Sequence, residues 1–245
     1  MAPYRAPAPG FLFRDHFFFR LFPVPTQKQG RDLEANGNIK HLSESLELWR
    51  LGDEHMLAMA DLIRERIDNI YDSRSQVEAD LADLAGHSHF VGIFKAGRLI
   101  STSILVIIKT PDRDLYIPED YKTAFEYAAL LERYDIDDLF LGIRHANARG
   151  ISIEDSHLAL RGIYDYINHI SPPHHTMALL EMMPPKKLRY YRRFGIQNHS
   201  LGPWTAPFLP DSPLETTITL RDELARVWSD DVWRVQGKEY RLKRA

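Results

Sequence analysis

The chain has 245 residues, of which 44% are hydrophobic and 27% charged, and its formal net charge is −3. This length supports one sizeable core with appendages, and the mildly acidic balance gives no basic field for nucleic acid. The absence of cysteine excludes disulfides, thiolate metal sites and a cysteine nucleophile, and it fits a reducing compartment. Since no apolar run reaches the ~18 residues that span a bilayer, we expect a cytoplasmic protein without a transmembrane segment.

Three zones differ in composition. Residues 1–45 are rich in Pro, Gly and Asn and are typical of an N-terminal arm and linker, although six of the twelve phenylalanines lie within 11–22. The simpler interpretation of these aromatics is an arm laid over the domain or a partner chain; the alternative is contact with a membrane surface or an acyl chain. Residues 46–220 alternate strand-like and helix-like patterns, which predicts one domain. Residues 221–245 are charged and predict a C-terminal helix or tail.

The first half of the middle zone begins with an alternating run at 46–51, which predicts a short strand. Apolar residues at helical spacing then predict a long helix over 55–71 with Asp53 as its N-cap, and a second helix follows near 76–85. Two β-rich runs around the turn 95–98 predict a hairpin.

The second half opens with a long connection at 111–135, which is helical in part. A strand then ends in a loop at Gly150, and the Ser152–Asp155 spacing indicates a capping box for the next helix. After it come an apolar strand over 175–183, a basic helix and two final strands, 197–204 and 214–220. A strand, a capped helix and another apolar strand make a crossover. The predicted fold is therefore α/β (α+β), with a mixed, partly parallel central sheet flanked by helices.

The basic helix lies within PPKKLRYYRRFGI, residues 184–196. Five of the eight residues from Lys186 to Arg193 are positive, and such a run is usually a solvated face. We take that interpretation for Lys186 and Lys187. The alternative is a docking surface for an acidic carrier protein or for phosphate groups.

Three local patterns in this order resemble the GNAT (GCN5-related N-acetyltransferase) superfamily over residues 46–220. The run HFVGIFKAGRLISTSILVI is similar to its second and third strands. The run NARGIS is similar to its cofactor loop, Gln/Arg-x-x-Gly-x-Gly/Ala. The run YRRFGI is similar to the end of its fourth helix, where Gly195 fits a C-cap. The resemblance implies a tyrosine, Tyr191, that protonates the departing thiolate. It also implies a cofactor loop made by Asn147, Arg149, Gly150, Ile151 and Ser152.

The run Ile143-Arg144-His145 further resembles the Glu-x-x-Arg motif of autoinducer synthases and long-chain N-acyl amino acid synthases, with Leu141 in place of the Glu. This branch implies an acyltransferase that moves an acyl group from acyl-CoA or an acyl carrier protein (acyl-phosphopantetheine) to a small-molecule amine such as an amino acid. The alternatives are an acetyl-CoA-dependent N-acetyltransferase and a non-catalytic acyl-CoA-binding module. The departures from the family patterns at Asn147, Ser152 and Leu141 favour the binding module.

Direct transfer to an amine requires a base for the amine, stabilisation of the oxyanion and an acid for the thiolate. Tyr191 is the candidate acid or a packing tyrosine. Glu181, alone in an apolar strand, is a candidate base or an exposed or paired carboxylate, and His145 is a candidate base or a loop histidine. Arg144 either binds a substrate carboxylate or forms a core salt bridge. We expect no metal, because the histidine pairs at 87/89 and 174/175 lack ligand spacing.

Overall fold

The computed structural model describes residues 39–41, 46–67, 70–193, 196–223, 232–235 and 238–241. Among these residues eight strands form one sheet in the order β1-β2-β3-β4-β5-β6-β8-β7. The strands are β1 (Ile39–His41), β2 (Leu46–Arg50), β3 (Ser88–Lys95), β4 (Arg98–Lys109), β5 (Asp138–Asn147), β6 (Met177–Met183), β7 (His199–Trp204) and β8 (Leu214–Leu220). Neighbouring strands are antiparallel except β5 and β6, which are parallel. The predicted mixed, partly parallel sheet is confirmed.

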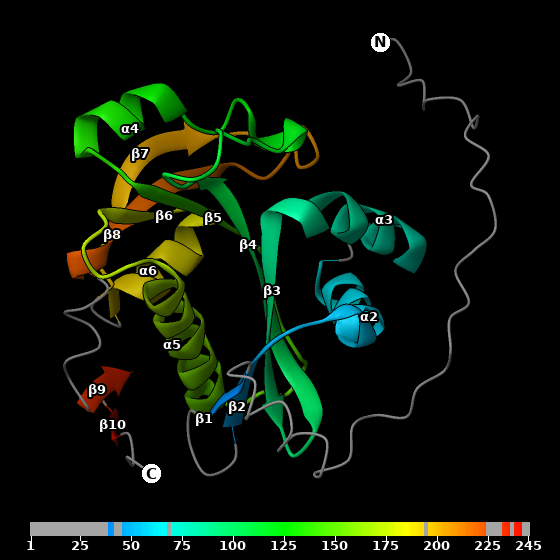
Figure 1. Cartoon of the computed structure of the whole chain (residues 1–245). Helices are drawn as coiled ribbons and strands as arrows, with labels where there is room; N and C mark the ends of the chain where they lie inside the picture. Colours follow the sequence, from blue (N-terminus) through cyan, green and yellow to red (C-terminus); the bar gives the residue numbers. More distant parts are fainter. Residues whose placement is uncertain are drawn as a thin grey trace, which may run out of the picture.

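Helices flank this sheet (Figure 1). They are α2 (Met56–Arg66), α3 (Arg74–Leu84), α4 (Tyr127–Tyr134), α5 (Ile153–Ile170) and α6 (Pro185–Arg193), with short 3-10 turns η1 (Asp53–His55), η2 (Ala85–His87) and η3 (Glu119–Tyr121). In Figure 1, α2 and α3 lie together beside β3 and β4, whereas α5 and α6 lie together on the other side of the view. No helix within the described ranges is long and apolar enough to cross a membrane.

The two ends of the chain contribute short strands. Most of the predicted arm lies outside the described residues, but β1 comes from it and pairs with β2 at the edge of the sheet. At the other end, β9 (Val232–Val235) and β10 (Lys238–Arg241) pair with each other as a separate ribbon. Within the predicted C-terminal helix or tail, 221–245, these two segments are strands, residues 221–223 are helical, and the other residues lie outside the described ranges.

The beginnings of the helices are determined by local hydrogen bonds. Asp53 was expected to cap the first long helix, and this is wrong: the chain enters α2 through the turn η1, and neither start has a side-chain cap. By contrast, Ser73 and Gln76 form a reciprocal capping box at α3. Ser152 caps α5 as predicted, because its hydroxyl accepts a hydrogen bond of 3.0 Å from the Asp155 N–H.

The hairpin between β3 and β4 turns through two residues, as the sequence predicts. Ala96 and Gly97 both have positive φ, 50° and 74°. Two consecutive left-handed residues give the turn whose twist matches that of the flanking strands.

Replacing Gly97 by Ala is expected to lower the free energy of unfolding by about 1–2 kcal/mol. The cause is backbone strain alone, because an added Cβ at Gly97 meets no atom within 4 Å. Urea unfolding measures the change, and Ala96→Gly, which places glycine at the other left-handed position, is the matched control. A loss in Ala96→Gly as large as that in Gly97→Ala would contradict this explanation.

Two irregularities in the middle of the sheet make room for a site. First, β5 carries a bulge: Ile143 lies opposite Ile104 and Ala146 opposite Thr102, so that Arg144 and His145 together face Ser103. Arg144 adopts a left-handed φ of 53° there. Second, β5 and β6 pair only as far as Gly142 and Glu181, and beyond this point β5 pairs with β4 but no longer with β6.

Candidate active site

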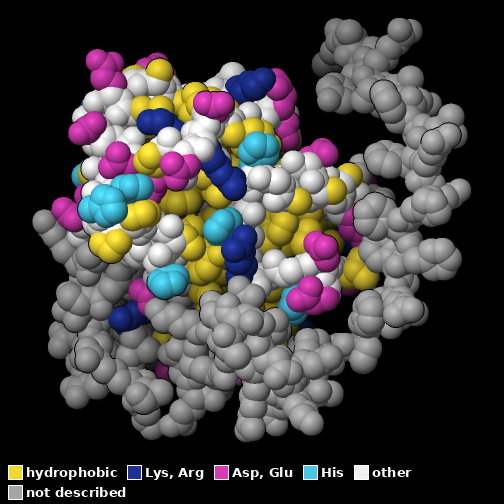
Figure 2. Space-filling model, in the orientation of Figure 1, with side chains coloured by type: hydrophobic (Ala, Val, Ile, Leu, Met, Phe, Trp, Pro, Cys, Tyr) yellow, Lys and Arg dark blue, Asp and Glu magenta, His cyan; other side chains and the backbone are white. Residues whose placement is uncertain are grey.

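A cavity of about 310 Å³ lies where β5 and β6 stop pairing. Its walls come from β4, β5, β6, α5, α6, the end of α2 and the segment 208–214. Much of the lining is apolar, including Ile67, Ile70, Leu105, Leu160, Ile163 and Leu179. In the view of Figure 2, hydrophobic side chains are visible at the centre of the molecule, with basic and histidine side chains beside them.

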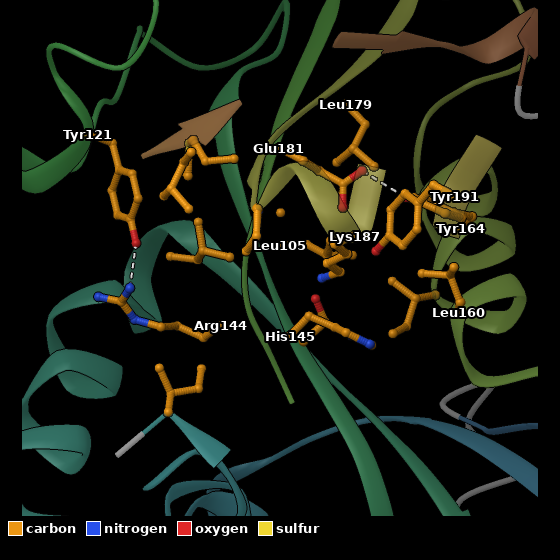
Figure 3. Close-up of a pocket in the computed structure, with 18 of the residues that line it drawn as sticks. Leu105, Tyr121, Arg144, His145, Leu160, Tyr164, Leu179, Glu181, Lys187 and Tyr191 are labelled. Carbon is orange, nitrogen blue, oxygen red and sulfur yellow. Dashed lines mark hydrogen bonds between the residues drawn. The ribbon is translucent and has the colours of Figure 1, made fainter. Parts of the chain in front are cut away.

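Polar side chains gather on two sides of this cavity (Figure 3). Glu181, Lys187 and His145 lie with two tyrosines on one side, and Arg144 lies with Tyr121 on the other. Glu181 lies near the end of β6, His145 is part of the bulge of β5, and Lys187 projects from the first turn of α6. The point where the parallel pair opens therefore brings His145 and Lys187 to one cavity, although they are 42 positions apart in the chain (187 − 145).

Glu181 contacts Tyr164, and Tyr164 contacts Tyr191. The Tyr164 hydroxyl donates a hydrogen bond of 2.7 Å to Glu181 Oε2. The rings of Tyr164 and Tyr191 meet edge to face, with centroids 6.3 Å apart, and both side chains are almost fully buried. The Lys187 ammonium lies 5.4 Å from the centroid of the Tyr191 ring.

Burial and neighbouring charges change the titration of this cluster. Burial raises the pKa of Glu181, against the opposing effects of the Lys187 charge and the Tyr164 hydrogen bond. Burial lowers the pKa of Lys187, and Glu181 opposes this shift. Burial together with the Lys187 charge lowers the pKa of His145 to about 3, so His145 is neutral at physiological pH. A carboxylate and a neutral imidazole at one cavity are both able to accept a proton.

Arg144 is held by several partners. Its Nε donates to the Tyr71 hydroxyl and, at 3.2 Å, to Asp80 Oδ2, and its Nη1 donates at 2.7 Å to the Tyr121 hydroxyl. Its guanidinium also lies 5.1 Å from the centroid of the Phe208 ring. The core salt bridge that the sequence offered as one alternative is therefore present. A substrate carboxylate would meet an arginine whose Nε and Nη1 groups are already engaged.

The predicted cofactor loop connects β5 to α5 and does not line the cavity. Asn147 Nδ2 donates to Ser156 Oγ at 3.1 Å, and the exposed Arg149 pairs with Glu65 at 3.2 Å. Gly150 has a φ of 76°, and an added Cβ there would meet no atom within 4 Å, so a ligand has room to approach its backbone. Ile151 follows in the same loop, and Ser152 caps α5.

The structure thus places Glu181, His145 and Tyr191 at one cavity, and it places Arg144 at the same cavity on the opposite side. The assignment of Lys187 to a solvated face is wrong, since its side chain borders the cavity. Lys187 precedes Tyr191 by four residues, so helical spacing alone could have put both on one face. No sequence signal distinguished Tyr164 from the other residues of its helix. Gly195, the expected C-cap, lies outside the described residues.

No group of three or more His, Asp or Glu side chains in the described part of the chain is placed to hold a metal ion.

No protein-family model and no curated protein matches the chain in sequence. Solved structures do match. FeeM, an N-acyl amino acid synthase from uncultured soil microbes, is 14% identical, with a TM-score of 0.53 over 72% of this chain and 97% of FeeM. A putative arylalkylamine N-acetyltransferase 7 from the mosquito Aedes aegypti is 12% identical, with a TM-score of 0.52 over 74% and 92%.

A third similar structure is that of AAC(6')-Ib in complex with ribostamycin and coenzyme A. It is 13% identical, with a TM-score of 0.52 over 76% of this chain and 99% of that protein. Identities this low establish architecture rather than activity. The resemblance drawn from the sequence is confirmed at that level: this chain has the fold of the GNAT superfamily.

Proposed function

We propose that the chain is a cytoplasmic N-acyltransferase. It transfers an acyl group from a thioester, acyl-CoA or acyl-phosphopantetheine on a carrier protein, to the amine of a small molecule such as an amino acid. The observation that carries this proposal is the meeting of Glu181 and Tyr191 at one apolar cavity, at the open end of the parallel strand pair. A base and an acid on one cavity are what direct amine attack on a thioester needs.

In this proposal the neutral amine attacks the thioester carbonyl without a covalent enzyme intermediate. Glu181 takes the amine proton, and Tyr191 protonates the thiolate that leaves. His145 is the alternative base, and its lowered pKa of about 3 makes its neutral imidazole the weaker proton acceptor of the two. In this proposal, backbone N–H groups of the bulge of β5 would supply oxyanion stabilisation.

The acyl chain and the acceptor use opposite sides of the cavity in this proposal. The aliphatic lining suits a medium or long acyl chain better than acetyl, because burying apolar surface stabilises the bound chain. Arg144 borders the side away from Glu181, and its Nη2 group would receive the carboxylate of an amino acid acceptor.

Charged residues near the loop 147–152 and on α6 bear on the identity of the acyl donor. The first turn of α5 carries Glu154 and Asp155, and acidic residues at a helix N-terminus oppose a diphosphate. Asp155 is paired with Lys95 at 2.7 Å. The basic residues Lys186, Arg189 and Arg192 are exposed on α6. Together these features favour a carrier-protein donor, although the loop 147–152 remains the proposed holder of its phosphate.

The test of this proposal is release of thiol from octanoyl-CoA, octanoyl-loaded acyl carrier protein and acetyl-CoA, each with the twenty amino acids and with tryptamine as acceptors. Mass spectrometry identifies the amide product. Octanoyl transfer to an amino acid supports the proposal. Transfer of acetyl alone would instead make the chain an N-acetyltransferase, and saturable octanoyl-CoA binding without any product would make it a non-catalytic binding module.

The pH dependence separates the two candidate bases. We expect kcat/KM to fall as the pH decreases through the pKa of Glu181, because only the carboxylate accepts a proton. This limb lies above pH 4.5, the value for a solvated glutamate, since burial raises the pKa of Glu181. His145, with a pKa of about 3, contributes no limb between pH 5 and 8.

The measurement is a profile of kcat/KM from pH 4 to 9 for the wild type, Glu181→Gln and His145→Gln. The Glu181 variant is expected to lose about 10²-fold in rate together with the acidic limb, and the His145 variant to keep both. The opposite pattern would assign the base to His145.

A further inference from the structure

Glu181, Tyr164 and Tyr191 form a continuous row beside the cavity (Figure 3). Tyr164 stands in the middle: its hydroxyl donates to Glu181 at 2.7 Å, and its ring meets the Tyr191 ring edge to face. Tyr191 also acts electrostatically on Tyr164, which contributes to raising the pKa of Tyr164. A phenol that donates to a carboxylate keeps lone pairs to accept from a second hydroxyl. The proposed base and the proposed acid are therefore joined by one side chain.

Amine acylation changes the protonation state of both groups that Tyr164 connects. In each turnover the base gains one proton from the amine, and the acid gives one proton to the sulfur. The base is then left as a carboxylic acid and the acid as a phenolate, so both must be reset before the next turnover. Tyr164 and Tyr191 have exposed fractions of only 1% each, which restricts direct exchange with bulk water.

We propose that Tyr164 is a positioning residue that relays the amine proton from Glu181 to Tyr191. This inference rests on the proposed function. It concerns how the two groups at the cavity are returned to their starting states.

The steps balance as follows in a single turnover. The amine nitrogen forms a bond to the thioester carbon, and Glu181 takes one N–H proton. The C–S bond breaks, and the thiolate takes the proton of Tyr191. The Tyr191 phenolate takes the proton of Tyr164, and Tyr164 takes the proton now on Glu181. One proton has moved from nitrogen to sulfur, and all three side chains are unchanged.

The surroundings of Tyr164 suit a relay that is not itself ionised. Burial, with Glu181 and Tyr191 nearby, raises the pKa of Tyr164 well above that of a solvated tyrosine. It is therefore a neutral phenol at the start and at the end of each turnover. The charged group that faces this row from α6 is Lys187, and from β5 the neighbour is the neutral His145.

The test compares Tyr164→Phe with the wild type and with Tyr166→Phe. Tyr166 is on the same helix and shares a hydrogen bond of 2.7 Å with His89, but it does not border the cavity. Both changes remove a phenolic oxygen from α5, but only Tyr164 is hydrogen-bonded to Glu181. Thiol release is followed in stopped flow with whichever octanoyl donor and acceptor gave product in the panel above, at a pH where Glu181 is ionised.

We expect Tyr164→Phe to release one thiol per protein at close to the wild-type rate and then to slow by about 10²-fold. The slow phase is expected to accelerate with added small buffers such as imidazole, which carry protons in place of the relay. The wild type and Tyr166→Phe are expected to be linear and insensitive to buffer. A fluorotyrosine at position 164 keeps the hydroxyl and is expected to restore linear release.

Each other result overturns a stated part of the inference. A linear trace at the wild-type rate in Tyr164→Phe would overturn the relay but would leave the proposed acyltransferase function intact. A uniformly slow trace without a burst and without buffer acceleration reduces Tyr164 to a support for Glu181. If the wild type releases no thiol with any acceptor, the proposed function fails, and the relay fails with it.

Discussion

Replacing Tyr191 by Phe is expected to lower kcat by about 10²-fold or more while leaving the Kd for octanoyl-CoA unchanged within about twofold. The change removes one oxygen from a side chain that is 1% exposed and keeps the ring that packs on Tyr164. Without the phenolic proton the thiolate must leave unprotonated or take its proton from water. Turnover is measured by thiol release, and binding is measured by isothermal titration without an acceptor.

The matched control for this prediction is Tyr116→Phe. Tyr116 stacks on His87 with a centroid distance of 3.7 Å and does not border the cavity, so its loss should leave kcat unchanged. A Tyr191→Phe protein that turns over at the wild-type rate would make Tyr191 a packing residue. The acid would then have to be sought elsewhere, with Lys187 as the first candidate.

Replacing Arg144 by Met is expected to lower the free energy of unfolding by about 3 kcal/mol. The side chain of Arg144 is 7% exposed and that of its partner Asp80 is 25% exposed, so Met leaves a largely buried carboxylate without its cation. The hydroxyl groups of Tyr71 and Tyr121 lose a donor at the same time. Urea unfolding gives the change.

Arg74→Met is the control, because Arg74 is 40% exposed and pairs with Asp61 and Glu78 at the surface. Surface pairs contribute about 0–1 kcal/mol, so little change is expected there. If Arg144→Met unfolds no more easily than Arg74→Met, the contacts of Arg144 are not structural. The same result would support the proposed role of Arg144 in binding an acceptor carboxylate.

The sequence predicted those parts of the fold that depend on local patterns. The turn at Ala96-Gly97, the cap at Ser152 and the apolar run of β6 each carry their signal within a few residues. The position of β8 between β6 and β7 depends on contacts far apart in the chain, which periodicity does not contain. Asp53 was mistaken for a cap because a turn that precedes a helix uses the same residue types as a cap.

Part of the site was also predictable from local sequence patterns. A lone Glu181 in an apolar strand and Tyr191 in a family-like motif were visible as residues, although their roles stay predictions. The left-handed bulge at Arg144 was not visible, because arginine has no preference for that conformation. Lys187 was assigned to solvent because charge patterns say nothing about which face of a helix meets a cavity.

The opening between β5 and β6 has a consequence for how this protein would evolve in the laboratory. Glu181 on β6 and Lys187 on α6 are ionisable groups of opposite sign that border a largely apolar cavity, and replacing buried charges of opposite sign by well-packed apolar residues is often neutral or stabilising. A screen that rewards only heat resistance should therefore accumulate apolar residues at these two positions first. The most heat-resistant descendants would have a filled cavity and no catalytic base. Thermal selection must therefore be coupled to a test for the product.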